Sequence, residues 1–250
     1  METKTIIQTN DLTKFYGTQA AVDHLTFDVR EGEIFGFLGP NGAGKTTTLL
    51  MLLGLTDPSA GTAQVMGINP AREPIRVKRH IGYLQENMGF YRELDARQTL
   101  KFITDLNDIP DDIANERIQS ALKTVGLEDA GNKLIAAYSR GMRQRLGIAE
   151  VLVKSPKIAF LDEPTLGLDP DTTNRLIEMI QWLSKEKKMT ILLSSHLLYQ
   201  VQRICDRVGI MINGKMVAHG EMDQLAEEKL GVGKESYSLE ELYMKYFQEA

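Results

Sequence analysis

Residues 39–46 read GPNGAGKT and match the pattern G-x-x-x-x-G-K-[ST]. The glycines let the backbone curve tightly and turn its N–H groups toward a polyanion. Lys45 can reach the β- and γ-phosphates of a nucleotide, Thr46 can place a hydroxyl on Mg²⁺, and Thr47 can contact the α-phosphate. A tight strand-to-helix turn without a ligand is the alternative. The pattern favours a nucleoside triphosphate site formed by Gly39, Pro40, Asn41, Gly42, Ala43, Gly44, Lys45, Thr46 and Thr47.

A second feature is a pair of acidic residues at the end of a predicted buried strand. The stretch KIAFLDEP, residues 157–164, predicts an apolar strand that ends in Asp162 and Glu163. Ligands of open α/β sheets bind at the carboxyl ends of the strands. Asp162 can hold Mg²⁺ directly or through water, and Glu163 can polarise the attacking water as a general base. Two adjacent acids can also begin a solvated loop, but beside a phosphate loop the catalytic interpretation is favoured.

His196 ends another apolar stretch, TILLSSH. A lone histidine is more often a packed or surface residue than a catalytic one. Here the strand is expected to run beside the acidic strand, so that His196 can contact the γ-phosphate and fix the geometry of the water. His24, His80 and His219 have no such setting and are expected to be structural.

The elements that must position these residues alternate between strands and helices, which indicates a mostly parallel sheet. Residues 6–29 are expected to form short antiparallel strands, and the helix after the phosphate loop should run from Lys45 to about Leu53. Helices are predicted in TLKFITDLNDI, IANERIQSALKTVGL, MRQRLGIAEVLV, TTNRLIEMIQWLSKEKK and LYQVQRICDRV, with breaks at Pro110 and Gly126. The stretch GIMINGKMVAHG predicts a hairpin that turns at Asn213 and Gly214.

Composition narrows the function classes. The chain of 250 residues has a formal net charge of −5, which gives no basic footprint for nucleic acid. Its single cysteine, Cys205, excludes an internal disulfide and is expected to be a buried small hydrophobic residue. No stretch approaches the roughly 20 apolar residues that span a bilayer, and the N-terminus has no apolar signal core. A membrane role is therefore expected to depend on another polypeptide.

Together these motifs resemble those of the ATP-binding cassette (ABC) transporter family, over nearly the full length of the chain. Further motifs support the resemblance: Tyr16 matches the aromatic residue that stacks on adenine, Gln85 the glutamine that senses Mg²⁺ and the attacking water, and GLDP, residues 167–170, the loop that crosses the dimer interface. YSRGMRQR, residues 138–145, occupies the signature position. The resemblance implies ATP and Mg²⁺ as ligands, with Thr46, Gln85 and Asp162 at the metal, and Lys45, Gln85, Glu163 and His196 in catalysis.

The signature departs from the usual L-S-G-G-Q. Ser139 and Gly141 are kept, whereas Tyr138, Arg140 and Met142 replace the leucine, the first glycine and the glutamine. Ser139 can still cap the following helix, and Gly141 still lets the backbone approach a phosphate. Arg140 adds a positive charge beside this polyanion site. This form resembles the exporter branch for drugs, antimicrobial peptides and sodium.

The resemblance also implies the architecture: a P-loop NTPase core of α/β class with a mostly parallel sheet, an N-terminal antiparallel β subdomain and a helical subdomain. We expect one ABC ATPase domain over 1–250. The core and β subdomain would cover 1–86 and 154–222, the helical subdomain 87–153, and a short helical tail 223–250. Two cassettes would pack head to tail around two ATP molecules, with Ser139 and Gly141 of one chain facing the phosphate loop of the other.

An integral membrane permease is the second implied partner. It would dock near residues 86–95, where Met88, Phe90 and Tyr91 offer apolar and aromatic groups, although each can equally belong to the subdomain core. The chain would then lie at the cytoplasmic face of the membrane and export a substrate that the sequence does not name. The alternatives are a non-transport ABC ATPase related to nucleic acid or translation, an inactive scaffold, and a simple kinase or GTPase.

Overall fold

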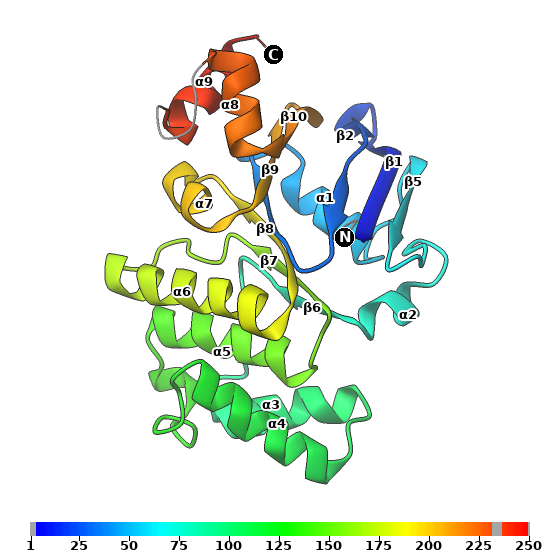
Figure 1. Cartoon of the computed structure of the whole chain (residues 1–250). Coiled ribbons are helices and arrows are strands. Elements are labelled where there is room, and N and C mark those ends of the chain that lie inside the picture. Colours follow the sequence, from blue (N-terminus) through cyan, green and yellow to red (C-terminus); the bar gives the residue numbers. More distant parts are fainter. Residues whose placement is uncertain (1–3, 232–236, 250) are drawn as a thin grey trace.

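The computed structural model describes residues 4–231 and 237–249. It contains a mostly parallel sheet, a smaller antiparallel sheet and a group of helices at the opposite end of the molecule (Figure 1). The α/β architecture expected from the sequence is therefore confirmed. Among the residues described, no helix combines the length and the apolar content that crossing a membrane requires.

The larger sheet has six strands in the order β10-β9-β4-β8-β7-β6. All neighbours run parallel except β9 and β10, which form the predicted hairpin. Asn213 and Gly214 turn this hairpin with φ values of 51° and 82°, as an Asn-Gly turn requires. Every residue of the four central strands is buried, which explains their continuous apolar sequences. The strands are β4 (Ile34–Leu38), β6 (Ile81–Leu84), β7 (Ile158–Asp162), β8 (Thr190–Ser195), β9 (Arg207–Ile212) and β10 (Lys215–Glu221).

The smaller sheet confirms the predicted antiparallel N-terminal region. Its first strand pairs antiparallel with each of the other three, and one of these partners, β5, was not expected from the sequence. Phe27 of this region packs against Phe35 and Phe37 of β4, with ring centroids 5.7 and 5.1 Å away, so that one apolar cluster joins the two sheets. The strands are β1 (Thr5–Tyr16), β2 (Gln19–Leu25), β3 (Asp28–Arg30) and β5 (Ala60–Val65).

A buried ion-pair network also joins the sheets. Arg207 of β9 places Nη1 3.1 Å from both Asp28 Oδ2 of β3 and Glu33 Oε1. Burial raises the pKa of Glu33 even though Arg207 opposes the shift. Burial also acts to raise the pKa of Asp28, but the hydrogen bond and charge of Arg207 outweigh it and the pKa is lowered. The arginine is therefore an electrostatic link between the sheets.

The region between β6 and β7 is mainly helical, as predicted. Asp95 and Gln98 form a capping box at the start of the first helix, Pro110 precedes the second, and Gly126 follows the second with a φ of 63°. Both breaks expected at Pro110 and Gly126 are therefore present. The elements are α3 (Ala96–Leu106), α4 (Asp111–Thr124), a 3₁₀ turn (Ile135–Ala137) and α5 (Arg140–Val153).

One predicted helix is shorter in the structure. The sequence predicts a helix over residues 198–208, whereas α7 ends at Ile204. Cys205 is extended, and the backbone N–H of Asp206 donates to the carbonyl of Ile34. The Asp206 carboxylate accepts in turn from the Ile34 N–H at 2.8 Å. These bonds draw Arg207 and Val208 into β9, so sheet pairing overrides the helical pattern.

Cys205 is buried against Gly36, and burial raises the pKa of its thiol. The prediction of a buried small hydrophobic residue is confirmed. The expected helical tail contains two helices that contact each other, although residues 232–236 and 250 lie outside the described residues. The remaining helices are α1 (Lys45–Leu52), α2 (Pro74–Lys78), α6 (Pro170–Lys187), α7 (Leu198–Ile204), α8 (Met222–Leu230) and α9 (Leu239–Glu249).

Candidate active site

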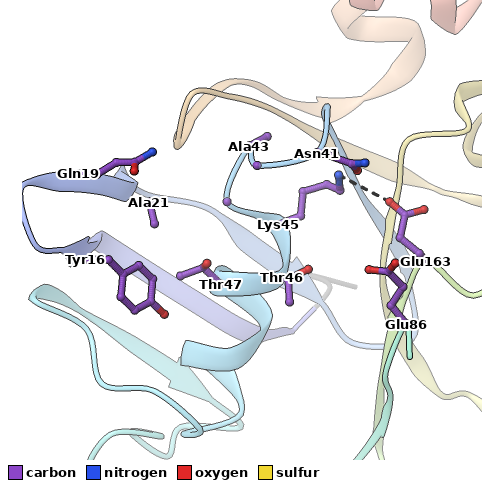
Figure 2. A pocket seen from close by; sticks show the side chains of 12 residues that line it. Tyr16, Gln19, Ala21, Asn41, Ala43, Lys45, Thr46, Thr47, Glu86 and Glu163 are labelled. Carbon is purple, nitrogen blue, oxygen red and sulfur yellow. Dashed lines mark ion pairs between the residues drawn. The ribbon is translucent and has the colours of Figure 1, made fainter. Parts of the chain in front are cut away.

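A cavity of about 410 Å³ lies where α1 begins, between the edge of the antiparallel sheet and the carboxyl end of β7 (Figure 2). Its lining combines the phosphate loop with residues from four other parts of the chain. Nine of the predicted site residues line it: Tyr16, Asn41, Gly42, Ala43, Gly44, Lys45, Thr46, Thr47 and Glu163. The sequence did not indicate three further lining residues, Gln19, Ala21 and Glu86.

The phosphate loop requires glycine at two positions for steric reasons. Gly44 precedes α1 in the left-handed region with a φ of 101°, and a Cβ atom there would lie 2.4 Å from the carbonyl oxygen of Ala21. At Gly39 a Cβ atom would lie 2.3 Å from the carbonyl oxygen of Met211. No side-chain cap is formed at the start of α1. Its first N–H groups and the positive end of the helix are therefore free to meet an anion.

Lys45 is 6% exposed and is held by the loop that it serves. Its Nζ donates to the carbonyls of Gly39 at 2.7 Å and Pro40 at 3.2 Å, and lies 3.6 Å from Glu163 Oε1. Burial lowers the pKa of Lys45, although Glu163 and Asp162 act in the opposite direction. Burying this cation costs free energy that a bound phosphate would offset.

Asp162 and Glu163 are both buried at the end of β7. Asp162 accepts hydrogen bonds from Thr46 Oγ1 at 2.9 Å and from the Ser194 hydroxyl. Hydroxyl and carboxylate oxygens are ligands that Mg²⁺ prefers. The described residues contain no group of three or more His, Cys, Asp or Glu side chains placed to hold a metal ion. The pair fits a magnesium ion that takes its other ligands from phosphate and water, which is the usual arrangement.

Glu163 has an unusual backbone and an unsatisfied oxygen. Its φ of 48° lies in the left-handed region, and its N–H is fixed by the carbonyl and hydroxyl oxygens of Ser194. Oε2 lies 3.0 Å from His196 Nδ1, while Oε1 is buried without a hydrogen-bond partner in the described part of the chain. Oε1 has the ion pair with Lys45 at 3.6 Å but accepts no hydrogen bond, so it can still accept one from a bound water. β7 and β8 pair in parallel, as the sequence predicted, and this pairing brings His196 to Glu163.

Tyr16 lies at the opposite side of the cavity from Glu163 (Figure 2). It ends β1, is 53% exposed, and Lys14 Nζ lies 5.2 Å from its ring centroid. An exposed aromatic ring that lines the same cavity as the phosphate loop can stack on a planar base. The cavity therefore offers an aromatic surface at one end and a cation with carboxylates at the other.

The predicted Gln85 is exposed beyond the end of β6 and does not line the cavity. Its neighbour Glu86 does, on the same side as Glu163 (Figure 2). Gly39, Pro40 and Asp162 are in contact with lining residues through hydrogen bonds. Among the predicted ATP-site residues of the core, Gln85 therefore neither lines the cavity nor forms a hydrogen bond with a lining residue in the described structure.

Ser139 and Gly141 lie at the start of α5 and do not line this cavity either. Ser139 Oγ accepts a hydrogen bond from the Met142 N–H at 3.2 Å, so it caps the helix as expected. The guanidinium of Arg140 rests on Gly167, where its Cζ lies 2.4 Å from the position that a Cβ atom would take. Arg140 thus packs on the 167–170 loop of its own chain.

Comparison with known proteins identifies this arrangement. A sequence model described as ABC transporter matches residues 22–166. The bacitracin transport ATP-binding protein BcrA of Bacillus licheniformis is 44% identical over 221 residues, which cover 88% of this chain and 71% of that protein. The chain belongs to the ABC transporter family.

Solved structures agree with this membership. A structure described as the ATP-binding subunit of an ABC transporter superposes with a TM-score of 0.87 at 31% identity, covering 97% of this chain and all of that one. A dimeric ATP-binding cassette in a post-hydrolysis state, bound to ADP and phosphate, has the same fold with a TM-score of 0.79 at 23% identity over 86% of this chain and 98% of that one.

Family membership establishes the general function of the chain. The chain is the ATP-binding subunit of an ABC transporter and belongs to a class of ATPases. The kinase and GTPase alternatives are excluded, because the family match extends through the signature region as well as the phosphate loop.

Proposed function

We propose that this ABC subunit hydrolyses ATP in two shared sites formed with a second cassette, and that it drives export through a separate integral membrane permease. The observation that carries the proposal is the position of Glu163 Oε1. This buried acceptor has no donor within the described residues and lies 3.6 Å from Lys45 Nζ, at the edge of the cavity. It is placed to accept a proton from water at the phosphate end of a nucleotide.

The chemistry follows from the side chains around that oxygen. Lys45 and the loop N–H groups hold the phosphates, while Tyr16 stacks on adenine. Glu163 takes a proton from the attacking water as oxygen bonds to the γ-phosphorus, and the bond to the β-phosphate oxygen breaks to leave ADP and phosphate. His196 holds the Glu163 carboxylate in position. Thr46 and Asp162 would hold Mg²⁺, which neutralises phosphate charge when bound. We retain Gln85 as a residue that would approach the metal and the water on closure.

The second cassette is proposed because the site is incomplete in one chain. Ser139 caps α5 and Gly141 lies in its first turn, and neither lines the cavity, so they can serve an ATP molecule only on another copy. The dimeric cassette with the same fold supports this arrangement. We propose a homodimer or a pair of related cassettes in which ATP joins the two chains.

The membrane partner is proposed to dock on residues 86–95, at the border of the helical subdomain 87–153. Met88 and Phe90 are partly buried against the core, whereas Tyr91 is 58% exposed with its ring edge on Phe102. Docking would place the chain at the cytoplasmic face of the membrane. The signature form of residues 138–145 and the kinship with a bacitracin transport protein support export.

Replacement of Glu163 by Gln tests the catalytic assignment. We expect Glu163→Gln to bind ATP but to lose about 10²- to 10⁴-fold in turnover, the range typical of a lost general base. The variant should remain a dimer on gel filtration with ATP and dissociate with ADP. Glu178→Gln, an exposed change on α6, is the control. Wild-type turnover by Glu163→Gln would show that Glu163 is not the base.

The permease assignment has its own test. Affinity purification of the chain from detergent-solubilised membranes should retain one polytopic membrane protein in the presence of ATP. Alanine at both Phe90 and Tyr91 should uncouple ATPase activity from transport by that complex. Transport that still follows ATP hydrolysis at the wild-type ratio would contradict docking at these residues.

A further inference from the structure

Two adjoining cavities lie beside the proposed docking segment, and we call them together the arginine groove. The first, of about 390 Å³, is lined by Met88, Gly89, Phe90, Arg92, Ile135 and Arg143. The second, of about 510 Å³, shares Met88, Gly89 and Arg143 with the first and adds Glu86, Asn87, Arg140 and Gln144. The lining of the groove therefore combines apolar side chains with three arginines.

The charges of the arginine groove are not balanced. Within residues 4–231 and 237–249, no carboxylate lies within ion-pair distance of Arg92, Arg140 or Arg143. Glu86 is the one acidic residue in the lining. Arg143 is fixed in place, because its Nη1 donates to the carbonyl oxygen of Tyr138 at 2.6 Å. Arginine held in a set position is well suited to pair with a carboxylate.

Gln144 provides a second, independent indication. It lines the same groove, is 5% exposed, and its Nε2 has no hydrogen-bond partner among the described residues. A buried donor without an acceptor is destabilising, because its lost hydration is not replaced. Among the described residues, the three arginines thus have no carboxylate partner, and Gln144 Nε2 has no hydrogen-bond acceptor.

We infer that the permease segment that docks in the arginine groove carries a carboxylate side chain, flanked by apolar residues, that pairs with Arg92 and Arg143. This inference rests on the proposed permease partner. A wholly apolar segment would bury guanidinium groups without a counter-charge, which disfavours binding. The apolar contribution of Met88, Phe90 and Ile135 favours a protein segment over a nucleic acid.

Glu86 connects the arginine groove to the nucleotide cavity. Glu86 lines both the arginine groove and the nucleotide cavity, so it lies between the docked carboxylate and the phosphate end of ATP. A carboxylate that enters the groove places a second negative charge near Glu86. Occupation of the groove and the charge of the nucleotide cavity are therefore linked through one residue.

The test measures binding of the chain to inverted vesicles that contain the membrane protein retained in the purification above. Arg92→Glu, Arg143→Glu and the double variant are compared with Arg72→Glu, an exposed arginine outside the groove. We expect the double variant to bind at least tenfold more weakly, and Arg72→Glu to bind within twofold of the wild type. Replacement of one cytoplasmic Asp or Glu of the membrane protein by Lys should restore binding of the double variant.

Several outcomes would overturn the inference. These are a double variant that binds within twofold of the wild type, an equal loss with Arg72→Glu, equal binding to vesicles that lack the membrane protein, and a loss that no substitution of a partner carboxylate restores. If the double variant unfolds at a lower temperature than the wild type, Arg92→Glu alone decides, because the Arg92 side chain forms no hydrogen bond or ion pair in the described structure. If no membrane protein is retained at all, the proposed permease partner itself fails.

Discussion

At the scale of single residues, most of the phosphate-loop residues that line the cavity could be predicted from the sequence. Their pattern is local in sequence, and each side chain has a chemical reason for its position. The three missed lining residues have no such signal. Gln19 and Ala21 come from a strand whose closeness to the phosphate loop depends on tertiary packing. Glu86 follows a strand end, where adjacent side chains point to different sides, so the sequence could not show whether it or Gln85 lines the cavity.

Lys45 permits a direct prediction at this scale. Lys45→Ala removes the buried cation that faces the phosphates, and ATP affinity should fall by at least about tenfold, as charged contacts of this kind contribute more than 1 kcal/mol. Titration with a fluorescent ATP analogue measures the loss. Lys185→Ala, on the far part of α6, should bind as the wild type does. Undiminished affinity in Lys45→Ala would contradict the assignment of the phosphate loop.

At the scale of elements, strands and helices with strong patterns were placed correctly, and the errors have physical causes. The helix pattern after Leu198 continues to Val208, but pairing of Asp206 with Ile34 ends α7 at Ile204. β5 was missed because AGTAQV has few apolar residues and forms a strand only where β1 offers an edge. Local periodicity cannot report a pairing partner that is distant in sequence.

Helix α5 contains a titratable group with a strongly altered environment. Burial raises the pKa of Glu150 from 4.5 to about 7. Because the folded pKa is above the unfolded one, the stabilising contribution is complete below about pH 4.5 and is lost as pH rises through 7. Glu150→Gln should therefore gain stability relative to the wild type between pH 5.5 and 8, by roughly 2 kcal/mol from this shift.

Urea unfolding of the wild type and of Glu150→Gln at pH 5.5 and at pH 8 measures this difference in the free energy of unfolding. Glu178→Gln, an exposed change on α6, should show no such gain. A stability difference for Glu150→Gln that is the same at both pH values would contradict a raised pKa.

At the scale of the whole molecule, the chain joins two sheets by an apolar cluster and by one arginine. The sequence predicted both sheets, but it could not predict their junction, because Arg207 is 174 residues from Glu33 in the chain. The division into core, helical subdomain and tail stays a prediction. One apolar cluster includes residues from the helical region and from the core, so packing alone does not draw these borders.

Removal of that arginine tests the junction. Arg207→Ala leaves Glu33 buried without its partner and should lower the free energy of unfolding by about 3 kcal/mol at pH 7. The pKa of Glu33 is already raised by burial, so the loss should shrink as pH falls and the carboxyl group takes up a proton. Chemical denaturation at pH 5 and pH 7 measures both effects.

The exposed pair of Arg30 and Glu221 provides the control for Arg207→Ala. Arg30 lies 3.5 Å from Glu221 in solvent, so Arg30→Ala should cost less than about 1 kcal/mol. If Arg207→Ala and Arg30→Ala lower the free energy of unfolding equally, Arg207 contributes no more to stability than an exposed arginine does.

The burial of Cys205 has a practical consequence. The thiol is the one cysteine in the sequence, it is 7% exposed, and its raised pKa keeps it protonated and unreactive. A cysteine introduced on the surface can therefore be labelled selectively in the native chain without removing the natural one. A pair of dyes or spin labels attached in this way, one per cassette, would report the approach and separation of the two chains during each cycle of ATP use.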